Sequence, residues 1–185
     1  MSIQADFDRI ALVSEDGATH NDHYHNFLLR HLPPNCHHAL EIGCGTGGFA
    51  RRLAKRSQRV IALDLSPEMI RLARERSAQF SNIDFELADI CGRPLSAQSF
   101  DCIASVATLH HLPIEETLLK MKAALKPGGI LLILDLFEPA RVSDSLMAGL
   151  TDSLSNLVAV PVSVGLRLIH HGLSLIHISE PTRPY

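Results

Sequence analysis

The sequence has no apolar run long enough to span a membrane. Ile130–Leu134 is an unbroken apolar stretch of strand length, and the apolar region 154–169 is interrupted by Asn156, Pro161 and Arg167. The first six residues contain neither a basic start nor an apolar stretch, so no secretory signal is evident. We therefore expect a cytoplasmic protein that does not insert into a membrane.

A strong charge imbalance is also missing. The formal net charge is −3, which gives no bulk attraction to nucleic acid or to anionic membranes. With 46% hydrophobic and 20% charged residues, the 185-residue chain is typical of one globular domain. The basic residues of the segment 51–59 are interpreted as the solvated face of a helix. Nothing in the sequence indicates an oligomeric state.

A regular cysteine framework is absent as well. The four cysteines (Cys36, Cys44, Cys91 and Cys102) form no C-x-x-C pair, which favours reduced thiols in a cytoplasm. Three of the eleven histidines, His20, His23 and His25, lie close together in the sequence. No cysteine or acid completes a metal-binding set at ligand spacing, so we expect no metal site.

What is present is a dense group of glycines, in the segment Leu40–Gly48, which reads LEIGCGTGG. So many glycines are costly in an ordered chain, which indicates that bare backbone is needed there. Gly43, Gly45 and Gly48 match the G-x-G-x-x-G of a dinucleotide-binding turn. Gly43, Gly45 and Gly47 match the G-x-G-x-G loop of a different nucleotide cofactor. The loop alone does not decide between them.

Strands and helices alternate along the chain, which predicts an α/β fold with a Rossmann-like open parallel sheet and helices on both faces. The predicted strands are Ala39–Ile42, Val60–Leu63, Ile83–Ile90, Asp101–Ala107 and Ile130–Leu134. The predicted helices are Asp22–Leu32, Gly48–Ser57, one capped by Ser66 with Pro67 in its first turn, and Pro113–Leu125. Ligands of such sheets bind at the carboxyl ends of the strands, where the glycine loop, Asp64, Asp89 and Ser105 fall.

Asp64 lies 21 positions after Gly43 and suits any adenosyl ribose, so it leaves the choice of cofactor open. The complete set of motifs is more specific. It consists of EIGCGTG at 41–47, LDLSPEM at 63–69, ADI at 88–90, FD at 100–101, TLHHL at 108–112 and LKPGG at 125–129. From about residue 20 to 137 the chain resembles the class I S-adenosylmethionine-dependent methyltransferases, and more narrowly the group related to ubiquinone and menaquinone biosynthesis methyltransferases.

The resemblance implies S-adenosylmethionine as cofactor, held by twelve residues. They are Gly43, Cys44, Gly45 and Gly47 at the methionine part, Glu41 near its amino group, Asp64 at the ribose hydroxyls, Leu65 and Met69 beside the adenine, Asp89 at the adenine amino group with Ile90 next to the ring, and Ser105 and Val106 below the sulfonium. The lysine–proline–glycine–glycine stretch at 126–129 is interpreted as a helix stop and a turn.

The implied reaction is methyl transfer by in-line displacement to a small-molecule acceptor that the sequence does not identify. His110 and His111 are the candidate bases if the acceptor carries a proton, although they could instead cap the following helix. Tyr24 and His25 are expected to close over the acceptor. Two alternatives are an NAD(P)-binding oxidoreductase and a non-catalytic fragment that only binds the cofactor.

The end of the chain departs from the family, whose sheet has the strand order 3-2-1-4-5-7-6. We expect a domain over residues 1–172 with strand order 3-2-1-4-5 and the last two strands missing. A helix capped by Ser143 is expected to carry leucines through Leu157, and Ile130–Leu134 is expected to have an unpaired outer edge. Residues 173–185 resemble the translation of a transposase-end sequencing adapter and are interpreted as a non-native tail; a genuine tail is the alternative.

Overall fold

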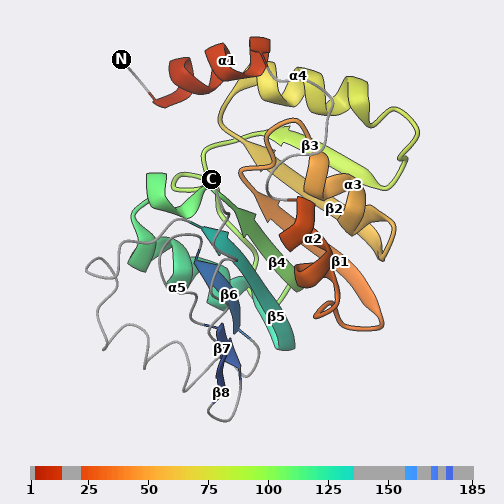
Figure 1. Cartoon of the computed structure of the whole chain (residues 1–185), viewed down its shortest axis with the longest axis vertical. Helices are drawn as coiled ribbons and strands as arrows, with labels where there is room; N and C mark the ends of the chain where they lie inside the picture. Colours follow the sequence, from red (N-terminus) through yellow and green to blue (C-terminus); the bar gives the residue numbers. More distant parts are fainter. Residues whose placement is uncertain (1–2, 14–21, 136–156, 162–167, 171–173, 177–185) are drawn as a thin grey trace, which may run out of the picture.

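The structure, a computed structural model, describes residues 3–13, 22–135, 157–161, 168–170 and 174–176. Its centre is a parallel sheet with the order β3-β2-β1-β4-β5-β6 (Figure 1). The strands are β1 (Cys36–Ile42), β2 (Ser57–Asp64), β3 (Ile83–Leu87), β4 (Phe100–Val106), β5 (Leu125–Asp135) and β6 (Leu157–Pro161). The predicted fold class and the order 3-2-1-4-5 are confirmed.

Helices cover both faces of the sheet (Figure 1). They are α1 (Ile3–Val13), α2 (Asp22–Leu29), α3 (Gly48–Ala54), α4 (Pro67–Arg76) and α5 (Ile114–Ala124), with the 3-10 helix η1 (Leu109–His111) after β4. The start of α4 follows the predicted cap, because Ser66 Oγ accepts a hydrogen bond from the Met69 N–H at 3.1 Å and Pro67 occupies the first turn. Helix α1 was not predicted from the sequence.

Alternate strand residues enter two separate cores, as the period of a β-strand requires. Ala39, Val60 and Cys102 belong to the core under α2, α3 and α4, whereas Leu40 and Ile103 belong to the core under α5. Burial on both faces explains why these strands read as apolar runs. The two cores fix the register of β1 between β2 and β4, and with it the positions of the strand ends.

Several predicted boundaries are wrong; the helix predicted over Gly48–Ser57, for example, ends at Ala54, and Ser57 begins β2. The helix from Asp22 ends at Leu29, because the next turn uses i→i+3 bonds such as Arg30 N–H to Phe27 O at 3.1 Å. The strand from Ile83 ends at Leu87. The segment 126–129, predicted as a turn, belongs to β5, whose pairing with β4 shifts register between Phe100 and Cys102.

The outer edge of β5 is paired, so the prediction of a bare edge is wrong. Leu131–Asp135 pairs in parallel with Leu157–Pro161. The leucine spacing that suggested a helix through Leu157 is overridden there by pairing to an open sheet edge. A separate antiparallel pair joins β7 (Leu168–His170) and β8 (Ser174–Ile176). Ser143 lies outside the described residues, and the proposed domain boundary at 172 stays a prediction.

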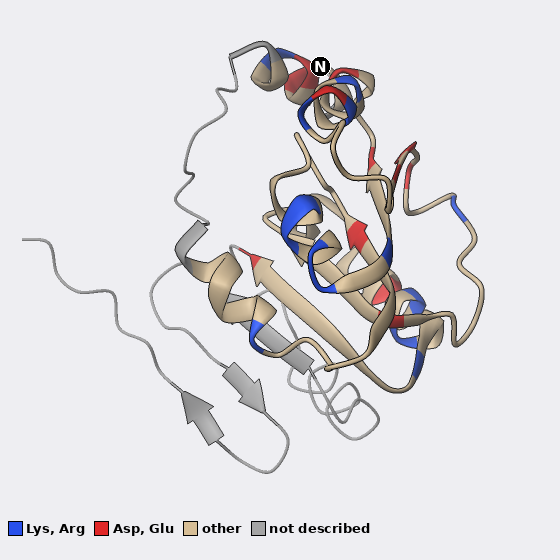
Figure 2. Ribbon diagram, turned by 90° about the vertical axis from the view of Figure 1, so that its right-hand side faces the viewer, with Lys and Arg blue, Asp and Glu red and all other residues tan. Residues whose placement is uncertain are grey.

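Basic residues of α3 and of the turn that follows it (blue in Figure 2) bond to neighbouring segments. Arg51 donates to Thr46 O at 2.9 Å, and Arg56 donates to Leu29 O at 2.9 Å. Lys55 is exposed, whereas Arg51 is half-buried. The predicted solvated face is therefore wrong for Arg51, which fixes the glycine loop to α3.

Candidate active site

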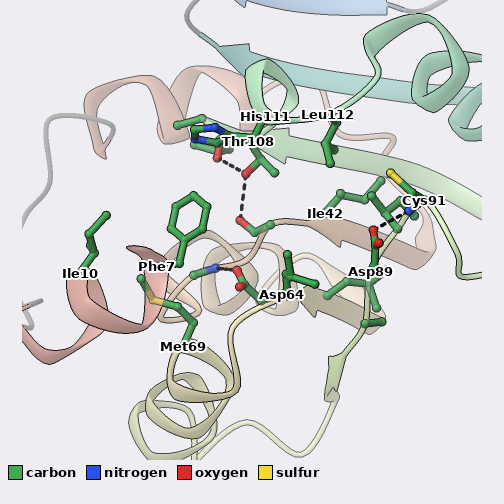
Figure 3. Close-up of a pocket in the computed structure, with 18 of the residues that line it drawn as sticks. Phe7, Ile10, Ile42, Asp64, Met69, Asp89, Cys91, Thr108, His111 and Leu112 are labelled. Atoms are coloured by element: carbon green, nitrogen blue, oxygen red, sulfur yellow. Dashed lines mark hydrogen bonds between the residues drawn. The ribbon is translucent and has the colours of Figure 1, made fainter. Parts of the chain in front are cut away.

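A pocket of about 580 Å³ lies at the carboxyl ends of β1 to β4 (Figure 3), within the ~300–1,000 Å³ typical of small-molecule sites. Its lining is largely apolar with a few polar groups. Of the predicted residues, those in the lining are Gly43, Gly45, Asp64, Leu65, Met69, Asp89, Ile90, Val106 and His111. The predicted convergence of strand ends on one crevice is thus present in the structure.

The glycine loop is tied to the end of β2. The N–H groups of Gly43 and Cys44 both donate to Leu63 O at 2.9 Å, and the Gly45 N–H donates to Asp64 Oδ2 at 2.8 Å. Gly47 lies outside the pocket lining and has φ +80°, and a Cβ there would lie 3.0 Å from Phe85. Gly47 is therefore required by backbone conformation and packing.

Asp64 is the most enclosed carboxylate of the pocket lining, with 9% of the residue exposed. Besides the loop N–H on Oδ2, its Oδ1 accepts the Ser66 N–H at 2.9 Å. Burial raises the pKa of Asp64, and Asp8 raises it further, against the lowering by backbone hydrogen bonds from Ser66 and Gly45. Each carboxylate oxygen retains a second lone pair, which is the capacity needed to accept two hydroxyl groups.

The loop after β3 forms an apolar slot with one exposed acid. Asp89 is exposed, and its Oδ1 accepts the Cys91 N–H at 2.9 Å. Lys120 of α5 donates to Ile90 O at 2.6 Å and to Cys91 O at 3.1 Å, which anchors the loop. Leu65 and Met69 line the same pocket, which therefore offers apolar surface and one carboxylate to a flat ring.

The opposite end of the pocket is formed by α1 and by the segment after β4. Phe7 and Ile10 of α1 line it, and Figure 3 shows the Phe7 ring pointing inward. The Phe7 and His111 rings meet edge to face, with centroids 5.2 Å apart. Asp8 accepts a hydrogen bond from the Ser66 hydroxyl, which holds α1 against the start of α4.

The two candidate bases differ in their surroundings. His111 is exposed and lines the pocket, whereas the His110 Nδ1 lies 2.5 Å from Asp135 Oδ1 at the end of β5. Burial lowers the pKa of His111, and His110 lowers it further, whereas Asp135 raises it. The His111 ring is therefore neutral near pH 7 and can accept a proton.

Seven predicted residues lie outside the pocket lining: Glu41, Cys44, Gly47, Ser105, His110, Tyr24 and His25. Glu41, Cys44 and Ser105 are buried next to the lining. His25 is buried with its ring 4.8 Å from that of Phe49, and Tyr24 packs against the same core. The structure does not bring Tyr24 or His25 to the pocket, and an acceptor-binding role for them stays a prediction.

Four functional candidates were missed by sequence reasoning: Phe7, Ile10, Thr108 and Asp135. Phe7, Ile10 and Ala11 have helical spacing, a signal that could have revealed α1. Thr108 stands in the TLHHL motif, and its Oγ1 donates to Val106 O at 3.1 Å. Asp135 contacts residues 25 positions earlier, a distance that no local pattern encodes.

Glu41 gives a testable prediction on stability. It is 1% exposed, and among the described residues its Oε2 has no hydrogen-bond partner. Burial raises the pKa of Glu41 well above 4.5, and Asp64 raises it further, whereas Arg51 lowers it. Because the folded pKa exceeds the unfolded one, the stability supplied by the protonated form is complete below about pH 4.3 and is lost as pH rises to the folded pKa.

The variant Glu41→Gln keeps the shape of the side chain but replaces the carboxyl group with an amide that does not ionise. We expect its melting temperature to exceed that of the wild type by an amount that grows as pH rises from about 4.3 towards the folded pKa of Glu41. The difference in the free energy of unfolding between variant and wild type grows by at most about 1.4 kcal/mol per pH unit. Thermal unfolding monitored by circular dichroism measures it, with the half-exposed Glu75→Gln as the matched control. A difference that does not change with pH contradicts the buried-carboxyl explanation.

The residues present fit S-adenosylmethionine. The apolar slot with Asp89 suits an adenine, the enclosed Asp64 suits a ribose diol, and the backbone of Gly43 and Gly45 borders the remaining space.

Within the described residues, no group of three or more histidine, cysteine, aspartate or glutamate side chains could hold a metal ion. No helix among them is long and apolar enough to cross a membrane.

Comparison with known proteins identifies the family. Residues 39–129 match the family model of a methyltransferase domain. A demethylmenaquinone methyltransferase of Tropheryma whipplei is 35% identical over 103 residues, which are 55% of this chain and 43% of that protein. A ubiquinone biosynthesis O-methyltransferase of Coxiella burnetii is 38% identical over 94 residues, 50% of this chain and 40% of that protein.

The similarity extends to a solved structure. The N-methyltransferase NodS of Bradyrhizobium japonicum WM9, in complex with S-adenosyl-L-homocysteine, is 27% identical with a TM-score of 0.62, covering 69% of this chain and 70% of NodS. The chain spans about two fifths of the length of the two curated relatives. These matches decide the glycine-loop ambiguity against the NAD(P) alternative. Residues 39–129 are a methyltransferase domain, and this domain belongs to the S-adenosylmethionine-dependent methyltransferases of class I fold.

Proposed function

We propose that this protein transfers a methyl group from S-adenosylmethionine to a hydroxyl-bearing aromatic small molecule, such as a hydroquinone or a phenol. The observation that carries the proposal is His111: a neutral imidazole at the wall of the same pocket that contains Asp64 and Asp89. The names of the relatives, a demethylmenaquinone methyltransferase and a ubiquinone biosynthesis O-methyltransferase, support this acceptor class.

When bound, S-adenosylmethionine supplies a methyl group on a positively charged sulfur, which leaves as a neutral thioether. Asp64 and the glycine loop fix the position of the nucleoside and methionine parts, and alignment is the main requirement of such a displacement. Phe7 and Leu112 line the pocket with apolar surface that limits the access of water. His111 accepts the hydroxyl proton of the acceptor on an imidazole nitrogen as the acceptor oxygen takes the methyl group. If the neighbouring ring carbon takes the methyl group instead, the proton of that carbon moves to the oxygen, which restores the hydroxyl and the aromatic ring.

Calorimetry followed by a transfer assay tests this function. We expect the protein to bind S-adenosylmethionine, and Asp64→Ala to weaken binding at least about tenfold, because hydrogen bonds to a charged group contribute roughly 1.5–3 kcal/mol each. The assay uses methyl-labelled S-adenosylmethionine with 1,4-naphthohydroquinone and catechol, and ethanolamine as the amine comparison. Label in a hydroquinone or catechol product supports the proposal; binding without transfer to either, or transfer to ethanolamine alone, contradicts it.

A further inference from the structure

Asp135 is a buried carboxylate outside the pocket lining that bonds to the segment after β4. It ends β5, and its side chain is fully buried. Oδ2 accepts the N–H of Thr108 at 3.1 Å and the N–H of His110 at 3.3 Å, and Oδ1 lies 2.5 Å from His110 Nδ1. A carboxylate without water must be satisfied by such donors, so Asp135 and the segment Thr108–His111 hold each other in place.

The segment held by Asp135 forms one wall of the pocket. Thr108 lies next to the glycine loop, with Oγ1 3.4 Å from Gly43 O. His110 turns its Nδ1 to Asp135, and its ring lies 3.8 Å, centroid to centroid, from the ring of His111. The His111 ring therefore contacts two rings, that of Phe7 on α1 and that of His110, which is itself held by Asp135 of β5.

We infer that Asp135 is a positioning residue that acts through His110 to hold His111 at the acceptor end of the pocket. The inference rests on the proposed function in one respect, the assignment of His111 as the base. The titratable groups that act on the pKa of His111 are His110 on its own element and Asp135 on β5. The other titratable residues of the pocket lining are Asp64, Asp89 and Cys91. Asp135 thereby has two effects on His111, on its orientation through His110 and on its proton affinity through charge.

A matched control exists at the opposite end of the sheet. Asp101 Oδ2 accepts the N–H groups of His37 and His38 at 3.0 and 2.8 Å, and Oδ1 accepts from Lys126 at 2.9 Å. Asp101 therefore has the same kinds of partner as Asp135: two backbone N–H donors and one basic side chain. Asp101→Asn reproduces the loss of a carboxylate far from the pocket.

The experiment is nuclear magnetic resonance of the histidine and phenylalanine rings, with His111 assigned by its loss in His111→Gln. In Asp135→Asn we expect the His111–Phe7 ring contact to weaken and the pKa of His111 to fall, because the carboxylate raises it. In His110→Gln, which retains both backbone bonds to Asp135, we expect the contact to weaken and the pKa of His111 to rise, because His110 lowers it. Asp101→Asn should change neither.

With an acceptor that the wild type methylates, Asp135→Asn should lower kcat about 10- to 100-fold while the acceptor KM changes less than about threefold, as expected for a misplaced base. An unchanged ring contact in both Asp135→Asn and His110→Gln, or equal changes in Asp101→Asn, overturns the inference. If Asp135→Asn does not fold, His110→Gln alone decides. The ring measurements need no acceptor, so they separate failure of this inference from failure of the proposed reaction.

Discussion

Gly43→Ala should abolish cofactor binding and destabilise the domain. Gly43 has φ +74°, a conformation that costs an L-residue roughly 1–2 kcal/mol. Its Cβ would lie 2.0 Å from Thr108 Oγ1 and 2.4 Å from Thr108 Cγ2, so the threonine must move. Overpacking adds about 1–3 kcal/mol, which gives a total loss of about 2–5 kcal/mol. Thermal unfolding and calorimetry with S-adenosylmethionine measure the two effects.

Two further variants identify the cause. Gly48→Ala is the control, because a Cβ at the first residue of α3 would meet nothing within 4 Å, and alanine favours the helix by up to about 1 kcal/mol. The double variant Gly43→Ala/Thr108→Gly removes the collision but keeps the backbone strain, and it also loses the hydrogen bond from Thr108 Oγ1 to Val106 O. It should recover part of the stability lost in Gly43→Ala. If Gly43→Ala binds the cofactor like the wild type, the close approach of the glycine loop to Thr108 is not required.

The parts of the site that sequence predicted are those encoded locally. Asp64 follows an apolar strand, Ser66 and Pro67 mark a helix start, and Gly43 and Gly45 are spaced for one tight loop. Each signal lies within a few residues of the feature that it predicts. Parallel pairing then brings these features to one edge of the sheet without further information.

The parts that were missed depend on contacts between distant segments. Asp135 reads as an ordinary strand end until β4 and β5 pair and place it beside His110. Phe7 belongs to the pocket only because α1 packs against α4, an arrangement that helix spacing does not reveal. Leu157 fits a helical leucine pattern equally well, and the open edge of β5 decides for a strand. Local patterns therefore predict the cofactor half of the site better than the acceptor half.

His111→Ala should lower kcat about 10²- to 10⁴-fold with the acceptor that the wild type methylates, and should leave the affinity for S-adenosylmethionine nearly unchanged. The reason is that His111 follows β4 and lines the pocket next to Phe7, whereas Asp64 and Asp89 follow β2 and β3 (Figure 3), where we propose that the cofactor binds. Steady-state kinetics and calorimetry separate the two quantities. The exposed His38, at the amino end of the sheet, supplies the control: His38→Ala should leave kcat unchanged.

The pH profile adds a second test of the same residue. A base must be neutral to accept a proton, so kcat falls as pH drops through the pKa of His111. Burial and His110 lower that pKa from 6.5, and hence the acidic limb of the profile should lie below pH 6.5. His111→Ala should lose this limb, whereas His38→Ala should keep it. If His111→Ala retains both the wild-type rate and the acidic limb, proton transfer occurs elsewhere, and the acceptor is one that loses no proton to the enzyme.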